Sequence, residues 1–235
     1  MAKLYIVPTP VGNLEDMTFR AVRILKEADL ILAEDTRTSS VLLKHYEIRN
    51  RVQSHHKFND HRTVKEIVER VIAGENIALI SDAGTPGISD PGAVLAGIVR
   101  DAGFPVVPVP GPSALTALVS VAGAGGKTLV FEGFLSPSPG KRRRRLKELL
   151  FSGDAVILYE SPYRILKLLE DLADIDSERR IVIGRELTKL HEEIIEGTAQ
   201  ALRDDFASRE SIKGECAVFV SGIKKIKLSD KSADN

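Results

Sequence analysis

The chain has 235 residues, and 33 basic residues balance 33 acidic ones, so no overall charge favours a nucleic-acid partner. One cysteine, Cys216, excludes an internal disulfide and any cysteine-based zinc site. The sequence shows no signal peptide and no apolar run long enough to cross a bilayer. We therefore expect a soluble, cytoplasmic α/β protein without a membrane partner, large enough for one large domain or two small ones.

The first apolar run, residues 4–7, predicts a strand that leads into a turn containing Pro10 and Gly12. A single glycine cannot form the G-x-G-x-x-G fingerprint, so a dinucleotide site of that type is not supported. Residues 18–26 predict a helix, because apolar side chains from Phe19 onward recur at helical spacing.

Residues 30–33 predict the second strand, and Glu34-Asp35-Thr36-Arg37 follows it. This segment is open to two interpretations. A threonine here can cap a helix over residues 39–46, with Asp35 favouring its positive end. Capping does not require Arg37, however, and it does not exclude a role in a functional site.

Three histidines, His55, His56 and His61, follow a short strand over residues 52–54. Adjacent side chains of a strand point to opposite faces, and no His-x₃-His spacing is present. We therefore expect a structural or substrate-contacting loop and no metal site. The next apolar positions, from Val64 onward, predict an amphipathic packing helix.

Residues 77–80 form an apolar run without alternation, which is typical of a strand buried on both faces. The polar segment Ser81-Asp82-Ala83-Gly84-Thr85-Pro86-Gly87 follows, and Asp90 then caps a helix over residues 93–102. An ordinary strand-to-helix connection is the alternative, but such loops usually have about 2–6 residues. We interpret this longer loop as a ligand loop at the carboxyl edge of an open α/β sheet.

Residues 106–109 predict another strand, which ends in Pro110-Gly111-Pro112-Ser113 before a nearly uncharged, buried helix over residues 114–121. The proline-glycine pair is the candidate boundary between two domains. The glycine-rich segment at residues 123–128 is not a P-loop, because Val121 occupies the position that requires glycine.

Five consecutive cations at residues 141–145 lie at the amino end of a predicted helix. Cations are disfavoured there by the helix dipole, so phosphate binding is the natural explanation and a solvated surface is the alternative. Further strands are predicted over residues 155–159, 181–184 and 214–220, and the polar, charged residues 224–235 are predicted to form a disordered tail.

Seven of these stretches, in the same order, resemble the ribosomal RNA small-subunit methyltransferase I family of the tetrapyrrole-methylase superfamily. The matching stretches are residues 9–16, 34–37, 81–92, 110–114, 132–135, 159–162 and 185–189. One segment differs from the family pattern. Where the family has His-Glu-His-Asn-Glu, this chain has His56-Lys57-Phe58-Asn59-Asp60.

The resemblance implies two α/β domains of the tetrapyrrole-methylase type, with the cofactor cleft between them. We place the N-terminal domain at residues 1–111 and the C-terminal domain at residues 112–223. The implied cofactor is S-adenosylmethionine. The implied reaction methylates the 2′-hydroxyl of a cytidine ribose in small-subunit ribosomal RNA, as naked rRNA or in the assembled small ribosomal subunit, and the implied assembly is a homodimer.

The resemblance also assigns site residues. The expected cofactor contacts are Pro10, Asp82, Ala83, Gly84, Thr85, Ser113, Ala114, Tyr159 and Leu187. The expected catalytic residues, whose roles as base, alkoxide stabiliser or phosphate ligand stay open, are Glu160, Asp35, Arg37, Arg185 and Lys189. The expected RNA contacts, from the basic run itself, are Lys141, Arg142, Arg143, Arg144 and Arg145.

Two other classes stay open at this point. A small-molecule methyltransferase of the tetrapyrrole type would need a more apolar cleft and no phosphate ligands. A non-enzymatic RNA- or ribosome-binding module would not bind the cofactor.

Overall fold

The computed structural model describes residues 2–55, 61–90, 92–123 and 128–222, with the backbone alone for residues 61–64. The chain divides into two compact units, Met1–Ala114 and Leu115–Asn235, here called the N-unit and the C-unit. The predicted glycine-rich segment at 124–127, the predicted tail and most of the histidine loop lie outside the described residues. No helix in the part of the chain that the structure describes is long and apolar enough to cross a membrane.

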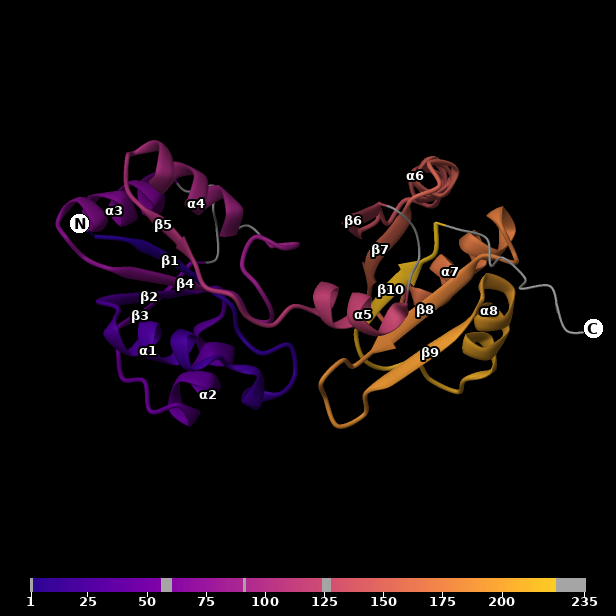
Figure 1. The fold of residues 1–235 in the computed structure, drawn as a ribbon, viewed down its shortest axis with the longest axis horizontal. Coiled ribbons are helices and arrows are strands. Elements are labelled where there is room, and N and C mark those ends of the chain that lie inside the picture. Colours follow the sequence, from indigo (N-terminus) through magenta and orange to yellow (C-terminus); the bar gives the residue numbers. More distant parts are fainter. Residues whose placement is uncertain (1, 56–60, 91, 124–127, 223–235) are drawn as a thin grey trace, which may run out of the picture. The chain divides into compact units, whose positions relative to one another are not determined.

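The N-unit is built on a five-stranded parallel sheet with the strand order β3-β2-β4-β1-β5 (Figure 1). Its strands are β1 (Leu4–Val7), β2 (Leu30–Ala33), β3 (Val52–Ser54), β4 (Ile77–Ile80) and β5 (Val106–Pro108). Every residue of β2 and β4 is buried, which explains why these runs are apolar without alternation. All five strands therefore end at one edge of the sheet.

Helices cover both faces of this sheet. Their bounds are α1 (Phe19–Glu27), α2 (Thr36–His45), α3 (His61–Ile72) and α4 (Gly92–Asp101), with a short 3₁₀ helix at Leu14–Asp16. Leu25 of α1 and Leu42 of α2 pack on one face, whereas Ile67 of α3 and Leu95 of α4 pack on the other. The helix predicted over residues 18–26 is present as α1, although Phe19 at its start is 98% exposed and does not pack against the sheet.

The C-unit contains a mixed five-stranded sheet with the order β6-β7-β10-β8-β9. Its strands are β6 (Leu129–Phe134), β7 (Ala155–Glu160), β8 (Arg180–Arg185), β9 (Glu193–Thr198) and β10 (Cys216–Val220). β10 is antiparallel to both of its neighbours, so Cys216 pairs with Glu160 on one side and with Arg185 on the other. The end of β7 and the end of β8 thus lie at the same edge.

The helices of the C-unit are α5 (Ala114–Ala122), α6 (Pro139–Phe151), α7 (Ile165–Ile175) and α8 (Ala199–Ser208). The prediction that α5 is buried was only partly right: Leu118 is buried, but Val121 is 55% exposed. Packing of α7 and α8 with the sheet forms the core of this unit around Leu169 and Phe206.

Candidate active site

The loops at the carboxyl edge of the N-unit sheet are joined by hydrogen bonds. Thr9, after β1, and Gly84, after β4, form an antiparallel bridge with N···O distances of 2.9 and 3.0 Å. The buried hydroxyl of Thr9 also donates to the carbonyl of Ser81 at 2.9 Å. Because buried polar groups are costly to leave unpaired, these bonds hold the two loops in one conformation.

The central loop also contacts the segment after β5. Gly84 has a φ of +79°, a conformation that favours glycine over any residue with a side chain. The next residue, Thr85, donates its hydroxyl to the carbonyl of Pro112 at 2.9 Å. The sequence motifs after β1, β4 and β5 are therefore parts of one rigid edge.

Asp82 links this loop to the motif after β2, because its Oδ1 accepts a hydrogen bond from the backbone N of Asp35 at 2.9 Å. Asp35 in turn caps α2 by accepting from the backbone N of Arg37 at 2.8 Å. The prediction that a threonine caps a helix starting at residue 39 was wrong, since α2 begins at Thr36. The sequence alone could not identify the N-cap of α2, because Asp35, Thr36 and Thr38 can each cap a helix.

Arg37 forms an ion pair with the residue that caps its own helix. Its Nε lies 3.2 Å from Asp35 Oδ1 and its Nη2 lies 3.0 Å from Asp35 Oδ2, while 91% of the Arg37 side chain is exposed. The side-chain hydrogen bond from Arg37, helped by the backbone bond, lowers the pKa of Asp35 from 3.8 to about 2. Asp35 is therefore ionised at neutral pH and has a low proton affinity.

This lowered pKa can be measured. Carbon chemical shifts of Asp35 followed over an acid titration should give a pKa near 2, and Arg37→Ala should return it towards 3.8. Because the folded-state value is the lower one, the stabilising pair is intact above about pH 4 and is lost as the pH falls towards 2. An unchanged pKa in the Arg37→Ala variant would show that the pair does not form.

A hollow of about 410 Å³ opens beside these loops. It is lined by Thr9, Pro10, Gly12, Leu14, Thr38, Ser39, Val41, Leu42, Ser81 and Asp82. Its volume falls in the range of about 300–1,000 Å³ that is usual for small-molecule sites. Of the predicted cofactor contacts, Pro10 and Asp82 line it.

Ser39 is a residue of this hollow that the sequence analysis missed. It is 4% exposed, and its Oγ makes no hydrogen bond within the described residues. A buried hydroxyl without a protein partner at the wall of a hollow is suited to a polar ligand. The run of hydroxyl residues along the start of α2 was the only signal in the sequence, and it does not distinguish Ser39 from its neighbours.

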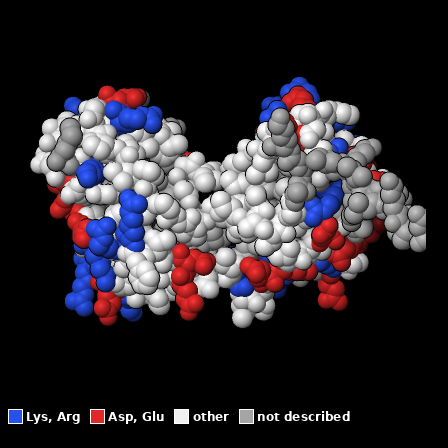
Figure 2. Space-filling model, viewed as in Figure 1, with Lys and Arg blue, Asp and Glu red and all other residues white. Residues whose placement is uncertain are grey.

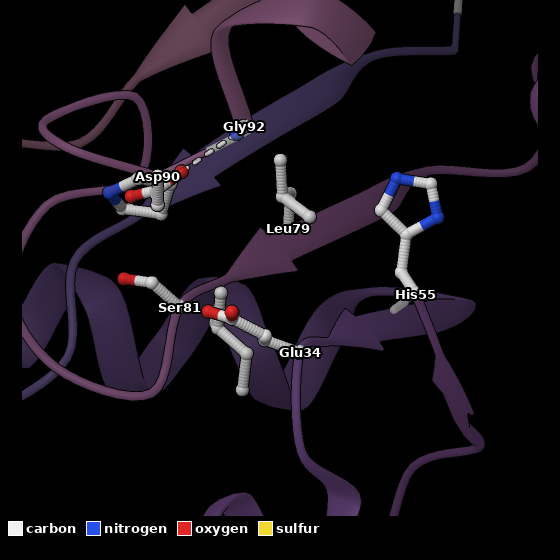
Figure 3. A pocket seen from close by; sticks show the side chains of 8 residues that line it. Glu34, His55, Leu79, Ser81, Asp90 and Gly92 are labelled. Atoms are coloured by element: carbon white, nitrogen blue, oxygen red, sulfur yellow. Dashed lines mark hydrogen bonds between the residues drawn. The ribbon is translucent and has the colours of Figure 1, made fainter. Parts of the chain in front are cut away.

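A second, much smaller space of about 10 Å³ lies at the same edge of the sheet (Figure 3). Glu34, His55, Ser81 and Asp90 are among its lining residues. Asp90 Oδ1 accepts from the backbone N of Gly92 at 2.6 Å, the bond drawn in Figure 3. Burial of the ring lowers the pKa of His55 below its usual value. The space has room for about one water molecule, so no cofactor fits there.

In the C-unit, the predicted catalytic residue Glu160 is the last residue of β7 and is 2% exposed. Its Oε1 accepts from the backbone N of Ser161 at 2.8 Å, and its Oε2 lies 3.2 Å from Arg164 Nη2. Tyr159, a predicted cofactor contact, packs edge-on against Phe131 at a centroid distance of 5.1 Å. Glu160 is thus held by its own loop.

The two predicted cations after β8 both have acidic partners. Arg185 Nε donates to Glu193 Oε2 at 2.7 Å, and Lys189 Nζ donates to Glu186 Oε1 at 2.8 Å. Leu187, between them, is buried and packs against Gly184, where a Cβ would lie 2.7 Å from Leu187 Cδ2. These contacts order the loop, and they leave Arg185 and Lys189 less available to phosphate than the sequence suggested.

The prediction that the whole basic run binds RNA was wrong for Arg142. Its side chain is 6% exposed, and its Nε lies 2.6 Å from Oδ2 of the equally buried Asp171 of α7. Arg143 pairs with Asp174 at 3.0 Å, and Arg145 pairs with Glu132 at 2.8 Å. Figure 2 shows acidic and basic side chains together over α6. Arg142 therefore attaches α6 to α7.

Lys141 and Arg144 are the two residues of the basic run whose charges remain available to bind RNA phosphates, as predicted for the whole run. Both are exposed, and neither forms an ion pair in the part of the chain that the structure describes. They are three residues apart on α6, so they share one face of the helix.

The chain is similar to known proteins over most of its length. Residues 3–203 match the family model of the Tetrapyrrole (Corrin/Porphyrin) Methylases. The protein named Ribosomal RNA small subunit methyltransferase I in Borrelia garinii subsp. bavariensis is 42% identical to this chain, over 93% of this chain and 98% of that protein. The protein of that name in Thermotoga maritima is 45% identical, over 94% and 99%.

The fold is also that of a solved structure, the cobalamin biosynthetic enzyme cobalt precorrin-4 methyltransferase. The TM-score is 0.69 over 93% of this chain and 94% of that one, with 18% identity, so this likeness concerns the fold alone. The family match and the high identity over nearly the full length of both relatives agree with the seven motifs. The chain therefore belongs to the tetrapyrrole methylase family and, within it, to the ribosomal RNA small subunit methyltransferase I group.

Proposed function

We propose that this methyltransferase transfers a methyl group from S-adenosylmethionine to the 2′-hydroxyl of a cytidine ribose in small-subunit ribosomal RNA. The observation that carries the proposal is the 42–45% identity, over nearly the full length, to proteins named for rRNA methylation. The likeness to a tetrapyrrole-type enzyme, at 18% identity, does not support a small-molecule substrate.

The hollow beside the N-unit loops suits this cofactor. S-adenosylmethionine carries an ammonium group, a carboxylate and ribose hydroxyls, and it supplies a methyl group already activated on a sulfonium. The exposed carboxylate of Asp82 can accept hydrogen bonds from such groups, and the unpartnered hydroxyl of Ser39 can offer another. Leu14 and Val41 supply apolar wall for the remainder of the molecule.

Further cofactor contacts from Ala83, Gly84, Thr85, Ser113, Ala114, Tyr159 and Leu187 stay predictions, and so does binding of one cofactor per chain without a metal. The same holds for the domain limits at residues 111 and 223, for a homodimer and for a cytoplasmic location, where small subunits are assembled in bacteria.

The substrate hydroxyl must lose a proton during the transfer, and a general base works best with a pKa near the operating pH. With a pKa of about 2, Asp35 is unsuited to that role. We assign Asp35 to positioning Arg37, whose exposed guanidinium can approach a phosphate or a developing alkoxide. Glu160 stays a predicted catalytic residue, and its role among base, alkoxide stabiliser and phosphate ligand stays open.

A panel of substrates tests the proposal. Purified protein with methyl-labelled S-adenosylmethionine should label assembled small subunits or naked small-subunit rRNA, and should not label uroporphyrinogen. Removal of metals by a chelator should leave the rate unchanged. Labelling of the tetrapyrrole alone would overturn the RNA assignment, and failure to bind the cofactor would leave a non-enzymatic binding module.

A further inference from the structure

A larger hollow, of about 590 Å³, lies on the other side of α2 within the N-unit. It is lined by Thr36, Ser40, Leu43, Lys44, Glu47, Ile48, Arg49 and Val52. None of these residues belongs to the hollow beside Asp82. We call this second hollow the α2–β3 hollow.

Helix α2 is the wall between the two hollows. Thr36, Ser40 and Lys44 are spaced by four residues and so share one helix face, which lines the α2–β3 hollow. Thr38 and Val41 lie on a different face and line the hollow beside Asp82. A helix is about 10–12 Å across, a span of about three stacked nucleotides at 3.4 Å each.

The charges of the α2–β3 hollow are unbalanced. Lys44 and Arg49 line it, Arg51 is exposed two residues further on, and none of the three forms an ion pair within the described residues. Glu47 is the single carboxylate among the lining residues. By contrast, Arg142 and Arg185 of the C-unit are each neutralised by an acid.

The segment that carries these cations is held in place. The side-chain amide of Asn50 donates to the carbonyls of Leu25 and Ala28 at 2.8 and 2.6 Å, at the end of α1. Asn50 stands between Arg49 and Arg51 in the chain, so their backbone is fixed before any ligand binds. Preorganisation of this kind lowers the entropic cost of binding.

We propose that the α2–β3 hollow binds a nucleotide of the RNA substrate next to the methylated one, with its phosphate on Lys44 and Arg49. The hydroxyls of Thr36 and Ser40 and the carboxylate of Glu47 can bond to ribose and base groups. Leu43, Ile48 and Val52 provide apolar surface for the base. This proposal rests on the proposed function, because α2 also carries the Thr36-Arg37 end of the candidate active site.

An RNA strand is the occupant that the charge favours. The two cations and one carboxylate that line the hollow leave it with a net positive charge, which favours a negatively charged ligand. RNA is such a ligand, because it carries one phosphate at every nucleotide of the strand. A strand can therefore bind in the α2–β3 hollow and continue around α2 towards Asp82.

The test is a double substitution, Lys44→Ala with Arg49→Ala, measured against naked small-subunit rRNA over a salt series. Loss of the phosphate that the two cations share should flatten the slope of log K against log salt by about 0.7, the value for one single-strand phosphate. The matched control replaces one lysine and one arginine elsewhere, Lys167 of α7 and Arg100 of α4, which covers the opposite sheet face. The control should bind RNA as the parent does.

Cofactor affinity and thermal unfolding of the Lys44/Arg49 variant should equal those of the parent, because both side chains are exposed. An unchanged salt slope would overturn this proposal and leave methyl transfer to rRNA by the parent protein intact. A change of oligomeric state, measured by sedimentation, would also overturn it, since the face would then join two copies. Failure of the parent to methylate RNA would instead remove the proposed function. Free cytidine monophosphate that competes with RNA binding as well as unlabelled RNA does, at the same nucleotide concentration, would show that the hollow binds a mononucleotide. That result would overturn the proposal that an RNA strand occupies it.

Discussion

Replacing Arg142 with alanine should lower the free energy of unfolding by about 3–5 kcal/mol, the cost of breaking a buried ion pair by removing one partner. Arg142 Nε lies 2.6 Å from Asp171 Oδ2, and both side chains are less than a tenth exposed. Without Arg142, the carboxylate of Asp171 stays buried, and the one cation left beside it in the part of the chain that the structure describes is Arg143, with Nη1 3.6 Å away. Urea unfolding measures the loss.

Two controls separate this effect from a general loss of charge. Arg144→Ala removes an exposed cation of the same helix and should change stability by no more than about 0.5 kcal/mol. Replacing both partners, Arg142→Met with Asp171→Leu, should cost much less than Arg142→Ala alone, because no unpaired charge remains. A stable Arg142→Ala variant with weakened RNA binding would restore the prediction that Arg142 contacts phosphate.

Replacing Asp82 with alanine should weaken the binding of S-adenosylmethionine by about 1.5–3 kcal/mol, the range for hydrogen bonds to a charged group. That range corresponds to a rise in Kd of about 10- to 150-fold, which calorimetry can measure. The fold should persist, because Asp82 is exposed on a loop and its one side-chain hydrogen bond within the described residues goes to the backbone of Asp35.

Asp82→Asn is the matched control. Its amide oxygen can still accept from the backbone N of Asp35, so the two loops stay joined while the charge is removed. We expect this variant to bind the cofactor less well than the parent and to keep the parent's thermal stability. An unchanged Kd in both variants would place the cofactor away from Asp82.

The sequence predicted the strands well where burial is complete. The runs 77–80 and 30–33 are apolar because β4 and β2 are buried at every residue, and their predicted limits are the observed ones. β9 escaped prediction because it is an edge strand with alternating burial, in which Ile194 is 43% exposed. Helix α8, which follows β9 in the chain, was not predicted either.

The candidate site was predictable to the extent that the chain itself places it. Loops at the carboxyl ends of parallel strands must meet, and the glycines and acids after β1, β2 and β4 marked them. The role of Arg142 was not predictable, because Asp171 is 29 residues away and only packing of α6 on α7 joins them. Ser39 and the α2–β3 hollow likewise follow from side chains that only the tertiary fold brings together.

Identification of the modified nucleoside tests the central claim most directly. RNA methylated by this protein, digested to nucleosides and analysed by mass spectrometry, should contain 2′-O-methylcytidine, and the methylated linkage should resist alkaline hydrolysis. The Asp82→Ala variant should yield less of it at limiting S-adenosylmethionine. Methyl groups found on a base, or no methylated nucleoside despite cofactor binding, would contradict the account.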